Sequence, residues 1–143
     1  MTYTVDFEHS FMQYTLKIVR DYHEDFPATL LLNCLLGLLI VPRETSFETI
    51  PDEPIANLSK WGIDPKSIIR MGRVHQNNAQ PDTLRELVRR LRNAVAHFRI
   101  EPIPKTEEVK SFRFTDENGF HAVIKLKELR VFVERLAEHL NRR

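Results

Sequence analysis

Three residues that could do chemistry together lie in the segment LRNAVAHFRI, residues 91–100. They are Arg92, Asn93 and His97. A histidine can hold or release a proton near neutral pH, because its unperturbed pKa is about 6.5. An arginine guanidinium is a fork of donors that suits a phosphodiester and the added negative charge of its transition state. An asparagine amide can orient an attacking hydroxyl or hold its neighbours.

This set of side chains could cleave RNA without a metal. RNA carries its own nucleophile, the 2′-hydroxyl, so a protein has only to move protons and stabilise charge on the phosphate. The acid and the base are normally two groups, whereas this segment offers one histidine. A two-fold dimer that placed the segment against its mate would supply two His97 and two Arg92 side chains in one cleft. We therefore expect a homodimer that acts on RNA.

The spacing of apolar residues predicts that the segment ends an amphipathic helix. The helix is expected to begin at Pro81 and Asp82, since a proline and an acid suit a first turn. Its apolar residues recur every three or four positions and are Leu84, Leu87, Val88, Leu91, Val95 and Phe98. At about 100° per residue, Arg92 lies on the flank of this stripe, Asn93 almost opposite to it, and His97 on the far side from Arg92. None of these three side chains is expected to be needed for the core.

Two further arginines, Arg85 and Arg89, precede the motif on the same outer surface. We expect them to contact RNA phosphates. The alternative is an ordinary solvated helix face, in which His97 is only a favourable charge beside the negative end of the helix dipole.

The remaining pattern predicts a mainly α-helical fold. Helical spacing indicates further long helices at residues 6–23, 28–41 and 126–140, and alternation around DENG indicates a β-hairpin with Gly119 in its turn. The expected architecture is an antiparallel bundle of four long helices plus one short one, with the hairpin between the last two long helices.

Two parts of this pattern have expectations of their own. The run 28–41 is shorter than the roughly 20 residues that span a bilayer, so we expect a helix buried on nearly all sides. Within it Asn33 is expected to be a core amide, or else to face the site or a subunit interface. Residues 43–80 are expected to form a long connection with one short helix from Pro65 to Met71, capped by Asp64.

Composition narrows the class of protein. The 143 residues suit a single domain, 1–143, and the net charge of +1 excludes a broad basic surface. The only cysteine, Cys34, fits a core position in a cytoplasmic protein, and the N-terminus does not resemble a signal peptide. The histidines are too scattered for a zinc site, and no glycine-rich phosphate loop occurs. We expect neither a metal nor a cofactor, and no membrane partner.

The chain resembles the HEPN (higher eukaryotes and prokaryotes nucleotide-binding) domains. RNAVAH, residues 92–97, matches the Arg-x4-His form of their motif, including the polar residue after the arginine. The order of helices and the position of the motif late in the third long helix are also similar to HEPN. The predicted hairpin before the last helix and the phrase TLLLNCLLGLLIVPRE, residues 29–44, look similar to a bacterial branch found on plasmids and genomes.

This resemblance implies a helical bundle that dimerises, often as a metal-independent endoribonuclease in toxin–antitoxin, phage-defence or RNA-processing systems. By position, Arg92 and His97 would be catalytic, with Asn93 in support. Arg99 stands where the branch paired with nucleotidyltransferase antitoxins has a tyrosine, so modification by such a partner is not expected, while another antitoxin remains open. Some HEPN domains keep the fold without cleavage, which makes a non-catalytic nucleic-acid-binding, nucleotide-binding or dimerisation module the alternative.

Overall fold

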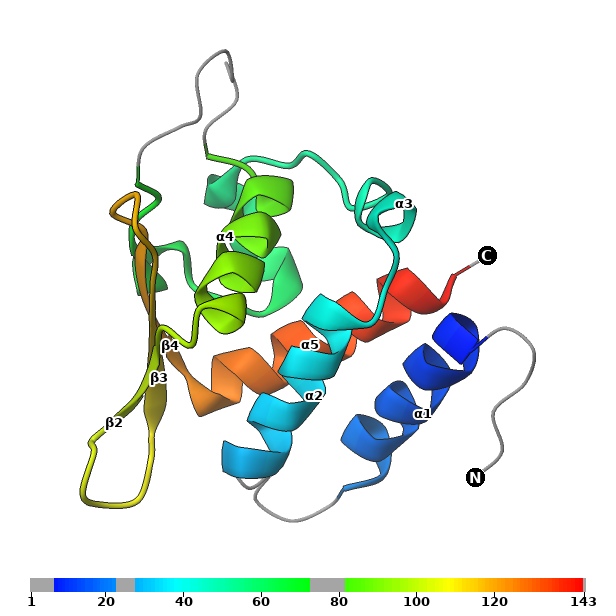
Figure 1. Ribbon diagram of the computed structural model, residues 1–143, viewed down its shortest axis with the longest axis horizontal. Coiled ribbons are helices and arrows are strands. Elements are labelled where there is room, and N and C mark those ends of the chain that lie inside the picture. Colours follow the sequence, from blue (N-terminus) through cyan, green and yellow to red (C-terminus); the bar gives the residue numbers. More distant parts are fainter. Residues whose placement is uncertain (1–6, 23–27, 73–81, 143) are drawn as a thin grey trace.

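The structure is a computed structural model that describes residues 7–22, 28–72 and 82–142. Over these ranges the chain is mainly helical with a small antiparallel four-stranded sheet (Figure 1), which confirms the predicted fold class at this level. The elements, with η for 3-10 helices, are α1 (Phe7–Asp21), α2 (Ala28–Ile40), α3 (Glu44–Phe47), η1 (Ile55–Trp61), η2 (Pro65–Ser67), β1 (Ile68–Arg70), α4 (Leu84–Ala96), β2 (Ile100–Ile103), β3 (Ser111–Thr115), β4 (His121–Lys125) and α5 (Leu126–Asn141). None of the described helices is long and apolar enough to cross a membrane.

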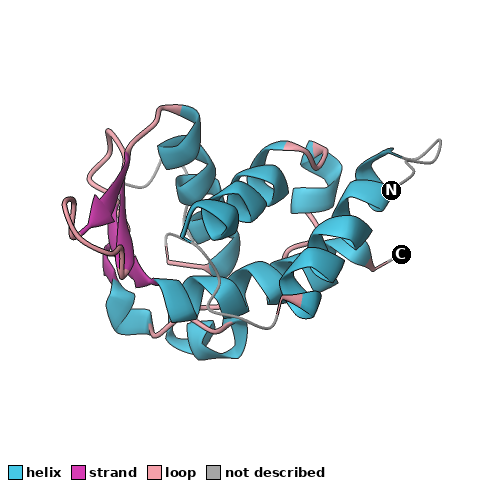
Figure 2. Cartoon of the chain, turned by 90° about the horizontal axis from the view of Figure 1, so that it is seen from below, coloured by secondary structure: helices cyan, strands magenta, loops and turns pink. Residues whose placement is uncertain are grey.

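The sheet is larger than a hairpin and has the strand order β1-β4-β3-β2. Its inner face is apolar and buried against the helices, which lie on one side of the sheet in Figure 2. The inner-face residues of β3 and β4 are Phe112, Phe114, Ala122 and Ile124. The sequence pattern missed β2 because Pro102 and Pro104 read only as helix terminators. A proline is tolerated in an edge strand such as β2, where one side of the backbone has no partner strand.

The short helix predicted from Pro65 to Met71 is only partly correct. Asp64 does cap a turn there, since its side chain accepts a hydrogen bond from the Lys66 N–H at 2.9 Å. The turn ends after three residues, and the chain continues as β1, paired with β4. The β-branched pair that begins β1 favours extended backbone, which explains why the helix stops.

Helix α2 packs in the centre of the described fold but is not buried on all sides. Helix α2 contacts α4 and α5, and Leu35 and Leu39 are fully buried, whereas Ile40 is 55% exposed. Asn33 is also exposed, so the expectation that it is a core amide is wrong. Helix α2 therefore has one stripe of its surface that the other described residues leave exposed.

Helix α4 begins and ends differently from the prediction. Thr83 is the N-cap, its hydroxyl accepting a hydrogen bond from the Glu86 N–H at 3.2 Å, while Pro81 lies outside the described residues. At the other end Phe98 has a φ of 54° and is 87% exposed, so its predicted place in the core is wrong. The N–H of Phe98 bonds the Val95 carbonyl and the next N–H bonds the Ala94 carbonyl. This is a Schellman ending, in which the left-handed position is usually glycine.

A buried cluster of charges joins α4 to the sheet, and sequence reasoning did not find it. Arg90 is 1% exposed, with Nε 3.2 Å from a Glu86 carboxylate oxygen and Nη1 3.0 Å from Asp116 Oδ2. Asp116 Oδ1 also accepts hydrogen bonds from the N–H groups of Asn118 and Phe120 in the β3–β4 turn. The cluster thus fixes both the rotation of α4 and the conformation of that turn.

Removing one member of this cluster should be costly. Asp116→Ala leaves the Arg90 charge buried with less compensation, and we expect the free energy of unfolding to fall by about 3–5 kcal/mol. Urea denaturation measures this value. Glu117→Ala is the matched control, because that neighbouring side chain is 71% exposed and its removal should change stability by less than about 0.5 kcal/mol. Equal effects of the two substitutions would show that the cluster does not stabilise the fold.

Candidate functional site

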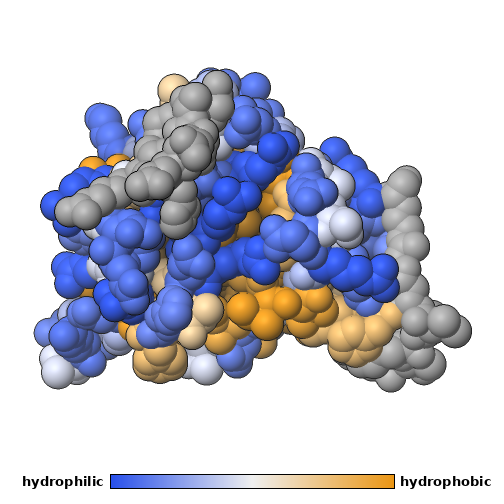
Figure 3. Space-filling view, turned by 45° about the horizontal axis from the view of Figure 1, so that its top comes forward, coloured by the Kyte–Doolittle hydropathy of each residue, from blue (hydrophilic) through white to orange (hydrophobic). Residues whose placement is uncertain are grey.

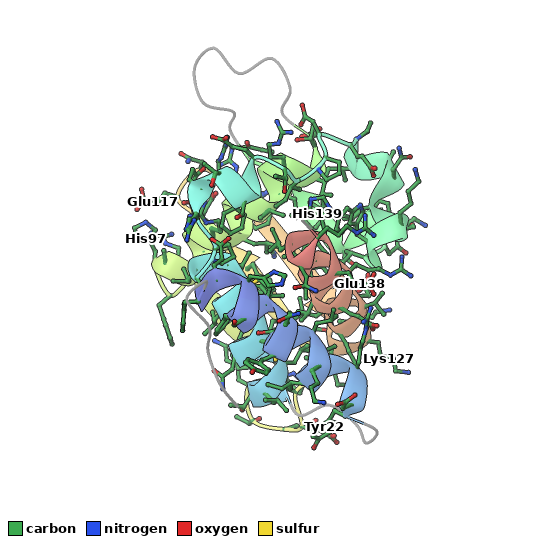
Figure 4. All side chains as sticks on the ribbon, turned by 90° about the vertical axis from the view of Figure 1, so that its right-hand side faces the viewer. Tyr22, His97, Glu117, Lys127, Glu138 and His139 are labelled. Carbon is green, nitrogen blue, oxygen red and sulfur yellow. The ribbon has the colours of Figure 1, made fainter. Side chains whose placement is uncertain are left out.

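The motif lies at the C-terminal end of α4, where the structure leaves His97 free. His97 is the C-cap residue, and its N–H donates to the Asn93 carbonyl at 3.1 Å. Its exposed side chain makes no hydrogen bond or ion pair within the described part of the chain. Figure 4 shows the imidazole projecting at the edge of the molecule, far from His139. An imidazole in this position can accept or donate a proton to a bound molecule.

Arg92, in contrast, is held by the protein. Its Nε donates to the Leu39 carbonyl at 3.1 Å, and its Nη1 donates to Glu44 Oε2 at 3.0 Å. The guanidinium carbon lies 4.2 Å from the centre of the buried Phe47 ring. The expectation that Arg92 has no part in packing is therefore wrong, because this side chain joins α4 to the end of α2 and to α3. The same contacts fix the direction in which the guanidinium points.

The two preceding arginines are also bonded. Arg85 Nε donates to the Ile50 carbonyl at 3.0 Å, and Arg89 Nη1 donates to Glu86 at 3.2 Å. With Arg92 they line a cleft of about 20 Å³ between α3 and α4, whose other lining residues are Glu44, Phe47, Glu48, Ile50 and Val88. A space of that size holds about one water molecule, so a nucleotide does not fit inside it. An RNA strand could meet these arginines only across the rim of the cleft.

The described residues do not join Arg92 and His97 directly. No hydrogen bond or ion pair joins Arg92 to His97 within residues 7–22, 28–72 and 82–142. His139 has partners away from the motif, since its Nε2 lies 3.0 Å from the Thr49 carbonyl oxygen and its ring packs edge-on against Trp61. Within the same ranges, no three His, Cys, Asp or Glu residues form a group that could hold a metal ion. His75 lies outside the described residues.

Cys34 and His121, both outside this region, are among the described groups whose pKa values are shifted. Burial raises the pKa of the Cys34 thiol, which favours the unreactive protonated form. Burial, with the nearby charges of Arg113 and Arg70, lowers the pKa of His121. Cys34 is thus a core residue, and His121 remains neutral more readily than an ordinary histidine.

Exposed apolar residues adjoin both ends of the motif. Phe98 follows His97 directly and is 87% exposed. Near Arg92, Ile40 is 55% exposed next to the Leu39 carbonyl that Arg92 binds. Apart from the motif, Phe7 on α1 is 51% exposed and packs on Phe11, with ring centres 6.1 Å apart. Figure 3 shows hydrophobic surface gathered in a band on one otherwise hydrophilic face.

Sequence reasoning missed Glu44 as a partner of Arg92. The only local sign is an acidic residue shortly after Pro42, where a new helix can begin. Residues 44 and 92 are 48 positions apart, and only the fold brings them together.

The family of the chain follows from a comparison with known families. The family model described as HEPN pEK499 p136 matches residues 1–143, so the chain belongs to the HEPN family. Membership supports a nucleotide-binding or ribonuclease-like module related to nucleic acids. No curated protein and no solved structure matches the chain.

The contacts of Arg92 predict a moderate stabilising role. Arg92→Ala removes a charged hydrogen bond to a carbonyl and the stacking on Phe47, so we expect the free energy of unfolding to fall by about 1–3 kcal/mol. Arg92→Lys should recover part of the loss, because lysine keeps the charge but not the planar fork. Arg99→Ala is the control, since its exposed ion pair with Glu117 should contribute less than about 1 kcal/mol. Urea denaturation of the three variants would contradict the assignment if Arg92→Ala were as stable as wild type.

Proposed function

We propose that the protein is a metal-independent endoribonuclease in which His97 moves protons and Arg92 stabilises the phosphate. The observation that carries the proposal is the contrast within one motif of a HEPN chain: His97 is exposed and has no partner among the described residues, while Arg92 is fixed in direction. The 2′-oxygen of RNA attacks the adjacent phosphorus as the bond to the 5′-oxygen breaks. The products are a 2′,3′-cyclic phosphate and a free 5′-hydroxyl.

The roles follow from the chemistry of each side chain. A neutral His97 accepts the proton of the 2′-hydroxyl, and a protonated one donates to the departing 5′-oxygen. The Arg92 guanidinium bonds the phosphate oxygens, whose negative charge grows in the transition state. Asn93 supports these groups, and Arg85 and Arg89 contact neighbouring phosphates from the cleft rim.

A second copy of the chain completes the site in this proposal. Each copy supplies one His97, so two copies supply an acid and a base. The exposed apolar residues at both ends of the motif favour association, since a large exposed apolar surface beside polar groups is typical of interfaces. A homodimer through this surface places two His97 side chains at one RNA phosphate.

The biological setting is part of the same proposal. A small ribonuclease of this family fits a toxin–antitoxin or phage-defence system, with RNA as its target and an antitoxin as a further partner. The non-catalytic binding or dimerisation module is the second candidate. It is favoured by the contacts of Arg92, which give that residue a structural role without any reaction.

Cleavage in the presence of EDTA decides between these functions. Wild-type protein should cut single-stranded RNA in EDTA and leave 2′,3′-cyclic phosphate ends. His97→Ala should lower the rate at least about 100-fold, the usual contribution of a general acid or base. Because the imidazole has no bonded partner in the described chain, the variant should remain within about 1 kcal/mol of wild-type stability.

His139→Ala is the control for this experiment, because that histidine lies far from the motif and should leave the cleavage rate unchanged. RNA that is bound but left intact by the wild-type protein would support the non-catalytic module. Cleavage that requires a divalent metal would contradict the proposed mechanism.

Association through the exposed surface can be tested separately. Phe98→Ser should weaken the homodimer and lower the cleavage rate, while the subunit keeps its stability because the ring is 87% exposed. Ile69→Ser is the matched control, an exposed apolar side chain on β1 that should change neither property. Light scattering over a range of protein concentrations measures the dimer. A wild-type monomer that cleaves RNA at the full rate would overturn the shared site.

A further inference from the structure

The guanidinium of Arg92 already donates hydrogen bonds to two groups of the protein. A phosphate is bound most strongly by two parallel N–H groups, supplied either by the Nε–Nη2 edge or by the Nη1–Nη2 edge. The Leu39 carbonyl takes Nε at 3.1 Å, and Glu44 takes Nη1 at 3.0 Å. The Leu39 carbonyl therefore closes the Nε–Nη2 edge to two bonds, and the Glu44 carboxylate, bonded to one of the two N–H groups of Nη1, places its negative charge beside the Nη1–Nη2 edge.

Only one of these two partners is free to leave. Leu39 is fully buried in α2, so its carbonyl is fixed by the core. The Glu44 side chain is 63% exposed and belongs to the four-residue helix α3. Its carboxylate can turn into solvent without any rearrangement of the core. The stacking on Phe47 and the bond to Leu39 would keep Arg92 in place when it does.

Glu44 also resembles the ligand that it would exclude. A carboxylate and a phosphate present similar anionic oxygens to an arginine fork. Glu48 lines the same cleft and makes no ion pair with another described residue. Two carboxylates thus lie where the proposed function requires an RNA phosphate, and their negative charges repel it.

We propose that Glu44 is an internal competitor that occupies the phosphate-binding edge of Arg92 and restrains RNA binding. The inference rests on the proposed function for the identity of the ligand, an RNA phosphodiester. RNA binds productively only when the Glu44 carboxylate moves away and the Nη1–Nη2 edge receives phosphate oxygens. An exposed ion pair is weak, so RNA can displace the carboxylate, and the restraint on affinity is about two- to fivefold.

The test measures binding without cleavage. The probe is a fluorescent single-stranded RNA with 2′-O-methyl groups, which lacks the attacking hydroxyl and cannot be cut by the proposed mechanism. Fluorescence anisotropy gives its Kd for the wild-type full chain, for Glu44→Gln and for Glu48→Gln. The last is the matched control, since it removes the same charge from the same cleft without a bond to Arg92.

We expect Glu44→Gln to lower the Kd by about two- to fivefold relative to both other proteins. The gain should disappear in the double variant Glu44→Gln with Arg92→Gln, because the released edge is then absent. Urea denaturation verifies that each variant is folded. A gain present in Glu44→Gln and lost in the double variant supports the competitor even if wild-type protein never cleaves RNA.

Three results would overturn it. Equal Kd values for Glu44→Gln and Glu48→Gln would show that the loss of any negative charge from the cleft has the same effect on RNA binding. A weaker complex for Glu44→Gln would show that Glu44 positions Arg92 instead of competing with RNA. If neither the wild type nor any variant bound the probe, RNA would not be a ligand of this protein. EDTA-resistant cleavage by wild type together with either of the first two results would overturn the competitor and leave the proposed function intact.

Discussion

A positive charge buried within the fold is the constraint on which the arrangement of α4 depends. Arg90 can be withdrawn from water only because Glu86 and Asp116 compensate its charge from two different elements. This requirement sets the rotation of α4 against the β3–β4 turn. Once that rotation is set, Arg92, two positions further along, points to the opposite side, toward α2 and α3. The motif is thus oriented by a group that takes no part in the proposed chemistry.

The sequence predicted the structure correctly where the periodic apolar positions are also the buried ones. The apolar spacing of α4 predicted the helix, though not its first residue or the exposure of Phe98 at its end, and the family is confirmed over the whole chain. The strand β2 was missed because an edge strand tolerates Pro102, which reads as a terminator. Arg90 was missed because a charged residue on a helix is normally solvated, and the carboxylate that completes its cluster, Asp116, is 26 positions away.

The candidate site divides in the same way. The exposure of His97 follows from its place at the end of a helix, which the sequence gives directly. The contacts of Arg92 with Glu44 and Phe47 form because the chain after α2 folds back beside α4. The spacing of residues in the sequence does not predict the path of that connection. Asn33 was misplaced for a related reason, because an apolar run suggests burial on all sides whether or not a neighbour covers each side.

The conformation at the end of α4 bears on which residue type is favoured at position 98. Phe98 occupies a left-handed position that costs a residue with a side chain about 1–2 kcal/mol and that glycine adopts freely. Its ring is also almost completely in water. A chain selected only for the stability of one subunit would place a small, flexible residue there. In the proposed homodimer, burial of this ring against the second copy offsets the cost that the single subunit carries.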